Sequence, residues 1–379
     1  MEWKEDVLGN VLEVKYGKDH KKLADGQYPV YGSGGLMRYV DSILYDGPSI
    51  LIPRKGTLNN IMFVDSPFWT VDTMFWSIIN TDKVDPKFLF YSICKRDFAS
   101  MNVGSAVPSM TVNILNDIQI SYPKNISDQR RIASILSSLD RKIELNNKIN
   151  ADLEEMAQAI FKNWFVDFEP FKDGKFVDSE LGMIPEGWKV GTLGEFCKCL
   201  LGGTPSRSKE EYWNGEVNWI NSGEINKFRI LEASEKITEL GLAKSATKLL
   251  PKKTTVLAIT GATLGQVSLL EIDTCANQSV IGVIENTEVP YEYIYPFIKD
   301  RIEMLIQHQT GGAQQHINKD NVESLIFLLP AKNVLENYIS LVGPMYKRIE
   351  SQCFENLYLS LLRDTLLPRL MSGELEVPE

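Results

Sequence analysis

Hydrophobic and polar positions follow two kinds of pattern along this chain, and the two kinds occur twice in the same order. Short apolar runs bounded by glycine, proline or asparagine come first and are typical of strands. They read PSILIP, NIMFVD and TMFWSII in the first half, and TTVLAIT, QVSLLEI and QSVIGVIE in the second. Each series is followed by a long segment whose apolar residues recur every three or four positions, which predicts a helix. The chain is therefore expected to have a mixed α+β fold.

The first long helix is predicted over residues 127–165, with Ser127 or Asp128 as its N-cap. Its apolar stripe has heptad spacing, and two positions of the stripe are asparagine. A buried asparagine in such a seam costs stability but fixes register and partner. The stripe consists of Ile132, Leu136, Leu139, Ile143, Asn146, Asn150, Leu153, Ala157, Ile160 and Trp164.

The second long helix is predicted over residues 333–372. Pro344 lies inside it and is expected to kink the helix or to delay its start. Its stripe consists of Leu335, Ile339, Val342, Tyr346, Ile349 and Cys353.

Both helices have at least about 35 residues and therefore span roughly 50 Å or more. The economical arrangement buries the two stripes against each other as an antiparallel coiled coil, with a globular domain at each end. The alternative is that each helix packs along its own domain.

The chain is also a tandem repeat at the level of residues. Trp3 and Trp188 open similar motifs, EWKEDVLG and GWKVGTLG, at an offset of 185. The offset is 206 between RKGTLNNIMFV and TGATLGQVSLL, and 207 between Pro123 and Pro330. The second copy therefore carries an insertion of 21 residues, which is expected in the polar stretch 202–219.

These patterns predict two globular domains separated by two long helices, related by a pseudo-two-fold. The expected divisions are 1–126 (first domain), 127–165 (central helix), 166–184 (linker), 185–332 (second domain), 333–372 (C-terminal helix) and 373–379 (tail).

Composition and charge narrow the class of protein. The 379 residues include 40 Lys and Arg against 50 Asp and Glu, a net charge of −10, and no region is basic. Bulk electrostatics therefore do not predict a protein that coats nucleic acid. Five cysteines without framework spacing fit a reducing compartment. No secretory signal or membrane-spanning run is visible, so a cytoplasmic location is expected.

Catalytic and metal-binding motifs are weak. Cys197 and Cys199 form C-x-C without a second pair, so a core position is favoured over a zinc site. The stretch LGGTPSRSKE lacks the order of a phosphate-binding loop. With three histidines and no recognisable triad context, the chain is interpreted as a binding protein without metal or catalytic residues.

Two different domains on a rod suit a target with two half-sites, which on duplex DNA lie about 35 Å apart or multiples of that. The motifs GWKVGTLGE, ITGATLGQV, ANQSVIGVI, GGAQQHINKDNV, SDQRRIASILSSLDRKIELNNK and IFKNWFVDFEPF resemble the DNA specificity subunit of type I restriction-modification systems. The resemblance covers nearly the whole chain, twice over.

The resemblance implies two target recognition domains, each reading one half of a split asymmetric DNA sequence, with the helices setting the spacer. It implies double-stranded DNA and two adenine-methylating modification subunits as partners, with restriction subunits joining through that complex. S-adenosylmethionine, ATP and magnesium are then expected in the partner subunits and no cofactor in this chain. The catalytic tetrapeptide of adenine methyltransferases is absent here, as expected for a non-catalytic subunit, and no membrane association is expected.

Candidate DNA contacts are the loop residues that combine glycines with hydrogen-bond donors. In the first domain they are Lys21, Lys22, Ser33, Arg38, Arg54, Lys55 and Asn59. In the second they are Thr204, Ser206, Arg207, Lys209, Lys253, Thr263, Gln314 and Gln315.

Several aromatic and terminal segments leave alternatives open. Trp164, Phe165 and Phe168 either form an exposed patch for a modification subunit or pack against the second domain. Tyr212, Trp213 and Trp219 either stack on DNA or belong to the core, and the C-terminal 367–377 either docks on the first domain or meets a partner. Two rival functions are a protein-holding adaptor and a methyltransferase that acts alone.

Overall fold

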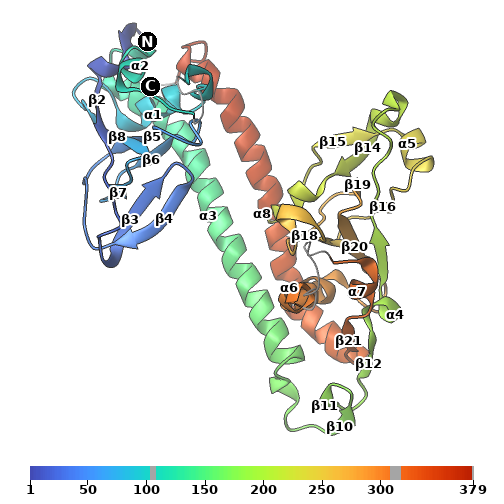
Figure 1. Ribbon diagram of the computed structural model, residues 1–379. Helices are drawn as coiled ribbons and strands as arrows, with labels where there is room; N and C mark the ends of the chain where they lie inside the picture. Colours follow the sequence, from blue (N-terminus) through green and yellow to red (C-terminus); the bar gives the residue numbers. More distant parts are fainter. Residues whose placement is uncertain (103–107, 308–316, 378–379) are drawn as a thin grey trace. The chain divides into compact units, whose positions relative to one another are not determined.

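The computed structural model describes residues 1–102, 108–307 and 317–377 and divides into two compact units. Unit 1 comprises Met1–Glu144 with Leu357–Glu379, and unit 2 comprises Leu145–Asn356. The long helices α3 (Ile126–Phe165) and α8 (Lys332–Met371) are 40 residues each, and each contributes one segment to each unit (Figure 1).

Unit 1 is built from small sheets with short helices beside them. Its strands, in sheet order, are β1 (Trp3–Val7) and β9 (Gln119–Pro123); β2 (Leu12–Tyr16), β8 (Met74–Ile79), β5 (Ser49–Pro53) and β6 (Met62–Val64); β4 (Gly35–Val40), β3 (Asp25–Gly32) and β7 (Trp69–Thr70). The helices are η1 (Leu8–Asn10), α1 (Pro86–Ile93), η2 (Ala99–Met101) and α2 (Val112–Asn116). Every residue of β5 is buried, as its unbroken apolar run predicts for an inner strand.

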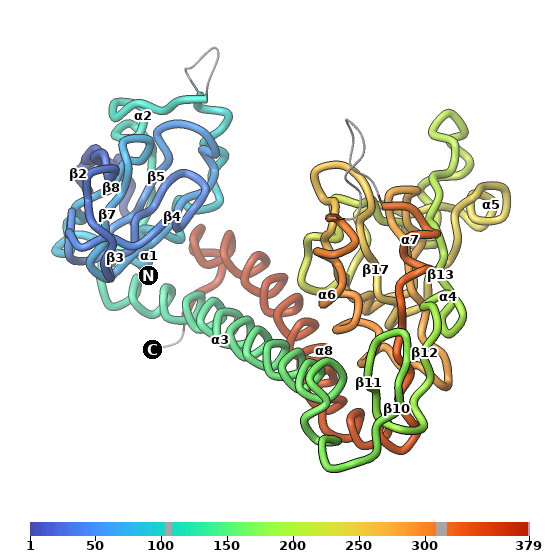
Figure 2. The backbone as a smooth tube through the Cα atoms, turned by 60° about the horizontal axis from the view of Figure 1, so that its bottom comes forward, coloured from blue at the N-terminus to red at the C-terminus, as the bar shows by residue number. Residues whose placement is uncertain are grey.

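Unit 2 repeats this plan. Its strands, in sheet order, are β10 (Phe176–Ser179) and β11 (Gly182–Pro185); β12 (Lys189–Thr192) and β21 (Ile326–Leu329); β13 (Lys198–Leu201), β20 (Val280–Ile284), β17 (Thr255–Ala258) and β18 (Val267–Leu269); β15 (Glu235–Ile237), β14 (Trp213–Ile220), β19 (Thr274–Ala276) and β16 (Leu249–Leu250). The helices are η3 (Glu169–Phe171), α4 (Leu193–Phe196), η4 (Glu210–Tyr212), η5 (Ser222–Asn226), α5 (Glu239–Ala243), η6 (Gly261–Thr263), α6 (Tyr291–Gln307) and α7 (Lys319–Glu323). The β10–β11 hairpin follows α3 and leads into β12 (Figure 2).

The tandem repeat is confirmed by strand register. Lys4 lies opposite Tyr122 in the β1–β9 pair, and Lys189 lies opposite Leu329 in the β12–β21 pair. These residues are related by the offsets of 185 and 207 that the sequence predicts. The two copies therefore pair their first and last strands in the same register.

The prediction that the insertion lies in 202–219 is wrong. The offset between equivalent residues is 189 at Val30 and Trp219 and 197 at Val40 and Ile237. The remaining additional residues include α5 and β16, which lie between β15 and β19. The added residues are spread over several connections because a connection can lengthen without disturbing strand pairing.

The helix α3 begins earlier than its predicted cap. Asn125 caps it by accepting a hydrogen bond from the Ser127 backbone N–H at 2.9 Å, so Ser127 and Asp128 lie inside the first turn. Pro344 does not delay the start of α8, which runs from Lys332 through that position. Pro344 is exposed, so its ring faces away from the packed side of the helix.

In unit 1 the ends of the two long helices join the domain core. Ile132 and Leu136 of α3 share one buried cluster with Leu367 and Leu370 of α8 and with Phe88 of α1. Further along, Arg363 of α8 forms an ion pair with Asp140 of α3 at 2.7 Å. The two helix segments run antiparallel in this unit, because residue numbers fall along α8 as they rise along α3.

In unit 2 the helix seam has a buried polar stretch, as its sequence predicts. Asn146 is fully buried and donates to Asn356 Oδ1 at 2.8 Å, while Gln352 Nε2 donates to Asn146 Oδ1 at 3.0 Å. One turn on, Asn150 Nδ2 lies 3.5 Å from Cys353 Sγ. These pairs also show an antiparallel arrangement.

The coiled coil is not the whole of the helix packing. Phe161 and Phe165 of α3 and Tyr338 and Val342 of α8 lie in the core of unit 2 together with Tyr293 of α6. Each helix therefore packs partly along its own domain, α3 through Ile132 and Leu136 and α8 through Tyr338 and Val342, whereas the end of α3 packs against the domain of the other copy. Of the remaining predicted seam residues in this unit, Tyr346, Ile349 and Cys353 are buried, and Leu153, Ile160 and Ile339 are half-buried; in unit 1 Leu139 and Ile143 are half-buried.

The C-terminal segment docks on the first domain, which was one of its two predicted alternatives. Leu375 and Val377 pack against the core of unit 1, and the ring of Trp3 closely approaches Gly373. The Met1 amino group lies 3.3 Å from Glu376. Within the described residues, no helix has both the length and the apolar content needed to cross a membrane.

Candidate nucleic-acid interface

The same backbone contact positions one loop in each unit. Gly17 N–H donates to Met74 O at 3.0 Å in unit 1, and Gly202 N–H donates to Val280 O at 2.9 Å in unit 2. Both glycines are needed, since a Cβ would lie 2.0 Å from Val71 O at Gly17 and 2.5 Å from a backbone oxygen of β19 at Gly202. The chain after each glycine is therefore held against the segment that precedes the equivalent strands β8 and β20.

Four segments meet at this place in each unit. We call them loop cluster 1, which comprises residues 18–22, 33–34, 54–57 and 71–73, and loop cluster 2, which comprises residues 203–207, 222–223, 259–263 and 277–279. The Ser-Gly turn after β3 is Ser33-Gly34, and its equivalent after β14 is Ser222-Gly223.

Loop cluster 1 surrounds a cavity of 610 Å³. Arg54 N–H donates to Thr73 O at 2.8 Å, and its guanidinium Nη1 donates to Asp72 O at 3.0 Å. Lys55 follows directly and is exposed. The cavity is lined by Asp19, His20, Lys21, Gly32, Ser33, Gly34, Met37, Val71, Asp72 and Thr73. The tertiary structure thus brings together the predicted contacts Lys21, Ser33, Arg54 and Lys55.

The charges in loop cluster 1 are mixed. Lys21, Arg54 and Lys55 lie among two carboxylates, Asp19 and Asp72. The Lys21 backbone N–H donates to Asp19 at 3.1 Å, and this hydrogen bond lowers the pKa of Asp19. The cluster therefore offers both donors and acceptors to a ligand, unlike a purely basic patch.

Loop cluster 2 has the same framework with different side chains. Thr204 donates to Gln278 Oε1 at 2.5 Å, and Ile259 N–H donates to Ser279 O at 2.9 Å. Ile259 thus occupies the place of Arg54, one residue earlier than the sequence alignment suggested. Thr263, a predicted contact, ends η6 in this cluster and is half-buried.

Arg207 and its neighbours form the outer part of loop cluster 2. The guanidinium stacks 3.6 Å from the ring centre of Trp213 and pairs with Glu235 through both terminal nitrogens. The mutual hydrogen bonds raise the pKa of Arg207 and lower the pKa of Glu235. Ser206 and Lys209, two further predicted contacts, are exposed.

Some predicted first-domain contacts have structural partners. Arg38 donates to Leu23 O at 2.7 Å and lies 3.3 Å from Asp25. Asn59 holds the loop near η2 by accepting a hydrogen bond from Ala99 N–H at 2.8 Å. Lys22 is exposed beside Lys21.

Lys253, a further predicted contact, has carboxylate partners within unit 2. Its side chain is 13% exposed, and its ammonium lies 2.5 Å from Glu271 and 3.0 Å from Glu350 of α8. These carboxylates compensate the charge of Lys253 inside unit 2. The other two predicted contacts, Gln314 and Gln315, lie outside the described residues.

The aromatic residues of the α3 end pack against the second domain. Phe165 lies 4.8 Å from the rings of Tyr293 and Tyr338, and Phe168 lies 5.6 Å from Trp188. Trp164 contacts Tyr338 at 6.0 Å. These three residues therefore pack against the second domain, which was one of their two predicted alternatives. They do not form the exposed patch for a partner subunit that was the other alternative.

Tyr212 and Trp219 are likewise core residues, at 5% and 2% exposure. Trp213 is half-buried beneath Arg207 and packs edge-on against Trp219. Tyr212 and Trp219 therefore belong to the core, as one of the two alternatives predicted. Trp213 instead lies under the exposed guanidinium of Arg207.

Two positions in the loop clusters were missed by sequence reasoning. Asp72 and Gln278 are exposed and lie in the segments before β8 and β20. The only available signal was their position in VDTM and ANQSV, just before strands that align between the copies. Neither motif contains the glycines and cations that mark the predicted contact loops.

Cys197 and Cys199 are buried in unit 2, and burial raises the pKa of each thiol to about 12. Across the described parts of the chain, no three His, Cys, Asp or Glu side chains are grouped to hold a metal ion. These thiols are core side chains, the favoured interpretation of the C-x-C motif.

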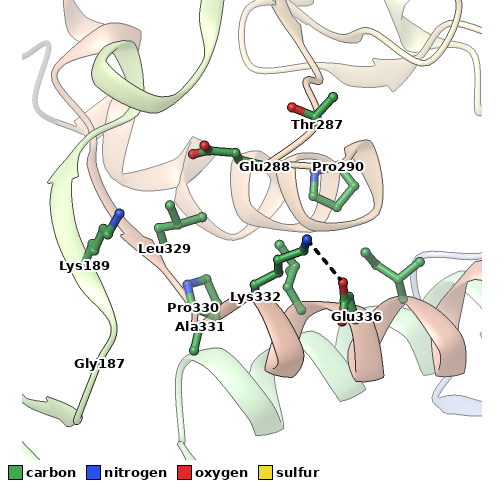
Figure 3. Close-up of a pocket in the computed structure, with 12 residues that line it drawn as sticks. Gly187, Lys189, Thr287, Glu288, Pro290, Leu329, Pro330, Ala331, Lys332 and Glu336 are labelled. Atoms are coloured by element: carbon green, nitrogen blue, oxygen red, sulfur yellow. Dashed lines mark ion pairs between the residues drawn. The ribbon is translucent and has the colours of Figure 1, made fainter.

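A separate pocket of 660 Å³ lies in unit 2 between β12, β21 and the start of α8 (Figure 3). Lys189, Glu288 and Lys332 line it, and Lys332 pairs with Glu336 at 3.8 Å. None of its lining residues belongs to loop cluster 2.

A family model and individual relatives place this chain in the same protein family. The model described as the type I restriction modification DNA specificity domain matches this chain twice, over residues 1–155 and 185–337. The type I restriction enzyme MjaIX specificity subunit of Methanocaldococcus jannaschii is 28% identical over 377 residues, covering 95% of this chain and 86% of that protein. The HindI specificity subunit of Haemophilus influenzae is 25% identical, covering 83% of each.

A solved structure shows the same fold. The crystal structure of the type I restriction-modification S subunit from M. genitalium superposes with a TM-score of 0.65. Its sequence identity is 15%, and the superposition covers 98% of this chain and 96% of that chain.

Proposed function

Because this chain belongs to the type I restriction-modification DNA specificity family and is a non-catalytic specificity subunit, we propose that its two units read the two halves of a bipartite, asymmetric DNA target. Loop cluster 1 contacts one half-site and loop cluster 2 contacts the other.

The observation that carries this proposal is the duplicated loop cluster. Gly17 and Gly202 make equivalent backbone hydrogen bonds, while the side chains around them differ in charge and size. Arg54 corresponds to Ile259, and Asp72 corresponds to Gln278. A common framework with different side chains is what two readers of different base sequences need, because base identity is read by the donors and acceptors of side chains.

We further propose that α3 and α8 set the spacer between the half-sites. A helix of 40 residues is about 60 Å long, which exceeds one turn of B-DNA. The buried polar contacts of Asn146 support a fixed register in this pair, since a one-turn slip would leave Asn146 and Gln352 without their partners.

The chain is proposed to recruit two modification subunits, which methylate adenine with S-adenosylmethionine, and through them restriction subunits that use ATP and magnesium. The net charge of −10 supports this division of labour. If partner subunits supply much of the phosphate contact, this chain alone binds DNA weakly and the complex binds tightly and with strong salt dependence. Nanomolar binding by the isolated chain at physiological salt would contradict that expectation.

The experiment is to express the chain with its modification partner and to map methylated adenines in the host genome. One bipartite motif with a fixed spacer is expected. Replacing unit 2 loop segments 203–207 and 277–279 by those of a relative should change one half of the motif and leave the other unchanged. If the motif is unaffected, the chain acts as an adaptor that holds proteins; if the isolated chain binds S-adenosylmethionine and methylates DNA, it acts as an enzyme.

A further inference from the structure

Asp72 and Gln278 occupy the same position in the two copies. The residue before each makes an equivalent hydrogen bond, from Val71 N–H to Tyr31 O at 3.1 Å and from Asn277 N–H to Ile220 O at 3.0 Å. Two residues after Asp72, Met74 O accepts the hydrogen bond from Gly17 N–H. Two residues after Gln278, Val280 O accepts the hydrogen bond from Gly202 N–H. The backbone on both sides of this position is therefore fixed in the same way in both units.

Both side chains are exposed on this fixed backbone. Gln278 Oε1 accepts a hydrogen bond from Thr204, which leaves a second lone pair on the oxygen and the Nε2 amide donors. Among the described residues, the Asp72 carboxylate has no hydrogen-bond or ion-pair partner; only the backbone oxygen of Asp72 accepts, from Arg54. Two exposed polar groups with unused hydrogen-bonding capacity thus project from equivalent sites.

The chemistry of the pair distinguishes base contacts from phosphate contacts. A carboxylate at the position of Asp72 repels a phosphate, so this position is unsuited to holding the DNA backbone. An aspartate accepts a hydrogen bond from the N4 amino group of cytosine, and a glutamine pairs with both N6 and N7 of adenine. The amide of Gln278 has the acceptor and the donor that adenine requires.

The neighbouring groups have the charge and hydrogen-bond donors that suit phosphate. In loop cluster 1 these are the ammonium and guanidinium groups of Lys21, Arg54 and Lys55. In loop cluster 2 Thr204 also fixes the Gln278 side chain, which lowers the cost of ordering it on binding. Each cluster therefore combines donors suited to phosphate with one exposed polar side chain, and in loop cluster 2 that side chain, Gln278, is held in place by Thr204.

We propose that this shared position reads a base in each half-site: Gln278 reads adenine in the half-site of unit 2, and Asp72 reads cytosine in the half-site of unit 1. Thr204 is the positioning residue for Gln278. This inference rests on the proposed division of the target between the two units and names the residues and bases within it.

The test uses the complex of the full chain with its modification subunits and maps methylated adenines for each variant. Gln278→Ala should make one position of one half-site degenerate, with a loss of discrimination of roughly 5- to 150-fold. Gln278→Glu should change the preference at that position from adenine towards cytosine. Asp72→Asn should change one position of the other half-site from cytosine towards adenine.

Thr204→Val tests positioning. It removes the hydroxyl that holds Gln278 without removing the amide, so it should weaken adenine discrimination less than Gln278→Ala and at the same position. Asp46→Asn alters another exposed carboxylate of unit 1 and should leave the motif unchanged. The thermal midpoint of each complex identifies any variant that fails to fold.

The outcomes separate this inference from the proposed function. A wild-type complex without a bipartite motif overturns the proposed function. A bipartite motif that stays the same in Gln278→Glu and Asp72→Asn, with methylation merely reduced, overturns the base-reading assignment alone. A change in the same half-site for both variants also overturns it.

Discussion

Arg229 Nη2 lies 2.7 Å from Glu154 Oε2, and the two side chains are 1% and 9% exposed. Glu154 projects from α3, while Arg229 follows η5 in the second domain. Tyr295 donates to Glu154 Oε1 at 2.8 Å, and Lys299 lies 2.5 Å from the same oxygen. One carboxylate on the central helix thus holds three groups of the second domain.

Removing that carboxylate should destabilise the protein. Glu154→Ala leaves the buried Arg229 charge uncompensated, which costs about 3–5 kcal/mol. Urea unfolding followed by circular dichroism measures the loss. Glu155→Ala, an exposed neighbour on the same helix, is the control and should change stability by less than about 0.5 kcal/mol. Equal losses in the two variants would contradict the role of the buried pair.

The same carboxylate gives a pH dependence of known sign. Burial alone would raise the pKa of Glu154, but the charges of Arg229 and Lys299 and the hydrogen bonds from Lys299 and Tyr295 outweigh burial and lower it. Its contribution is therefore fully present above the unfolded carboxyl pKa of about 4.3 and is lost as the pH falls through the lower folded pKa. The stability difference between wild type and Glu154→Gln should narrow between pH 5 and pH 3. A difference that widens over this interval would contradict the assignment.

Substituting Gly17 or Gly202 should impair recognition of one half-site and leave the other unchanged. A Cβ at Gly202 would lie 2.1 Å from Asn277 O, and a Cβ at Gly17 would lie 2.0 Å from Val71 O. We expect Gly202→Ala to displace segment 277–279 and to impair only the half-site of unit 2, and Gly17→Ala to impair only the other. Each should also cost about 1–3 kcal/mol of stability.

Methylation mapping and thermal unfolding of the two complexes test this. Gly34→Ala is a control for stability, because its Cβ would meet no heavy atom within 4 Å. Loss of both half-sites in either glycine variant would show that the clusters do not act separately.

The length of the α3–α8 helix pair should determine the length of the spacer between the two half-sites. Inserting one heptad into α3 after Glu144 and one into α8 after Asn356 keeps the apolar stripe in phase and adds about 10 Å. At 3.4 Å per base pair this should lengthen the spacer by about three base pairs. Methylation mapping reads the spacer directly. An insertion of three residues in each helix breaks the heptad phase and should reduce methylation instead.

The sequence by itself determined the tandem repeat, the α+β class and the two long helices. These follow from local patterns, since heptad spacing and recurring motifs are properties of neighbouring positions. It also determined that Asn146 and Asn150 lie in the helix seam, because both asparagines fall on the apolar stripe.

Only the tertiary structure decided which exposed side chains form a site. Gly17 meets Met74, and Gly202 meets Val280, across separations of more than fifty residues that no local pattern encodes. The loop clusters depend on those contacts, and so does the equivalence of Asp72 and Gln278. The ion pairs of Lys253 also depend on the tertiary structure: Glu350 of α8 is 97 residues away, and the pairing of β17 with β18 brings Glu271, 18 residues away, within ion-pair distance.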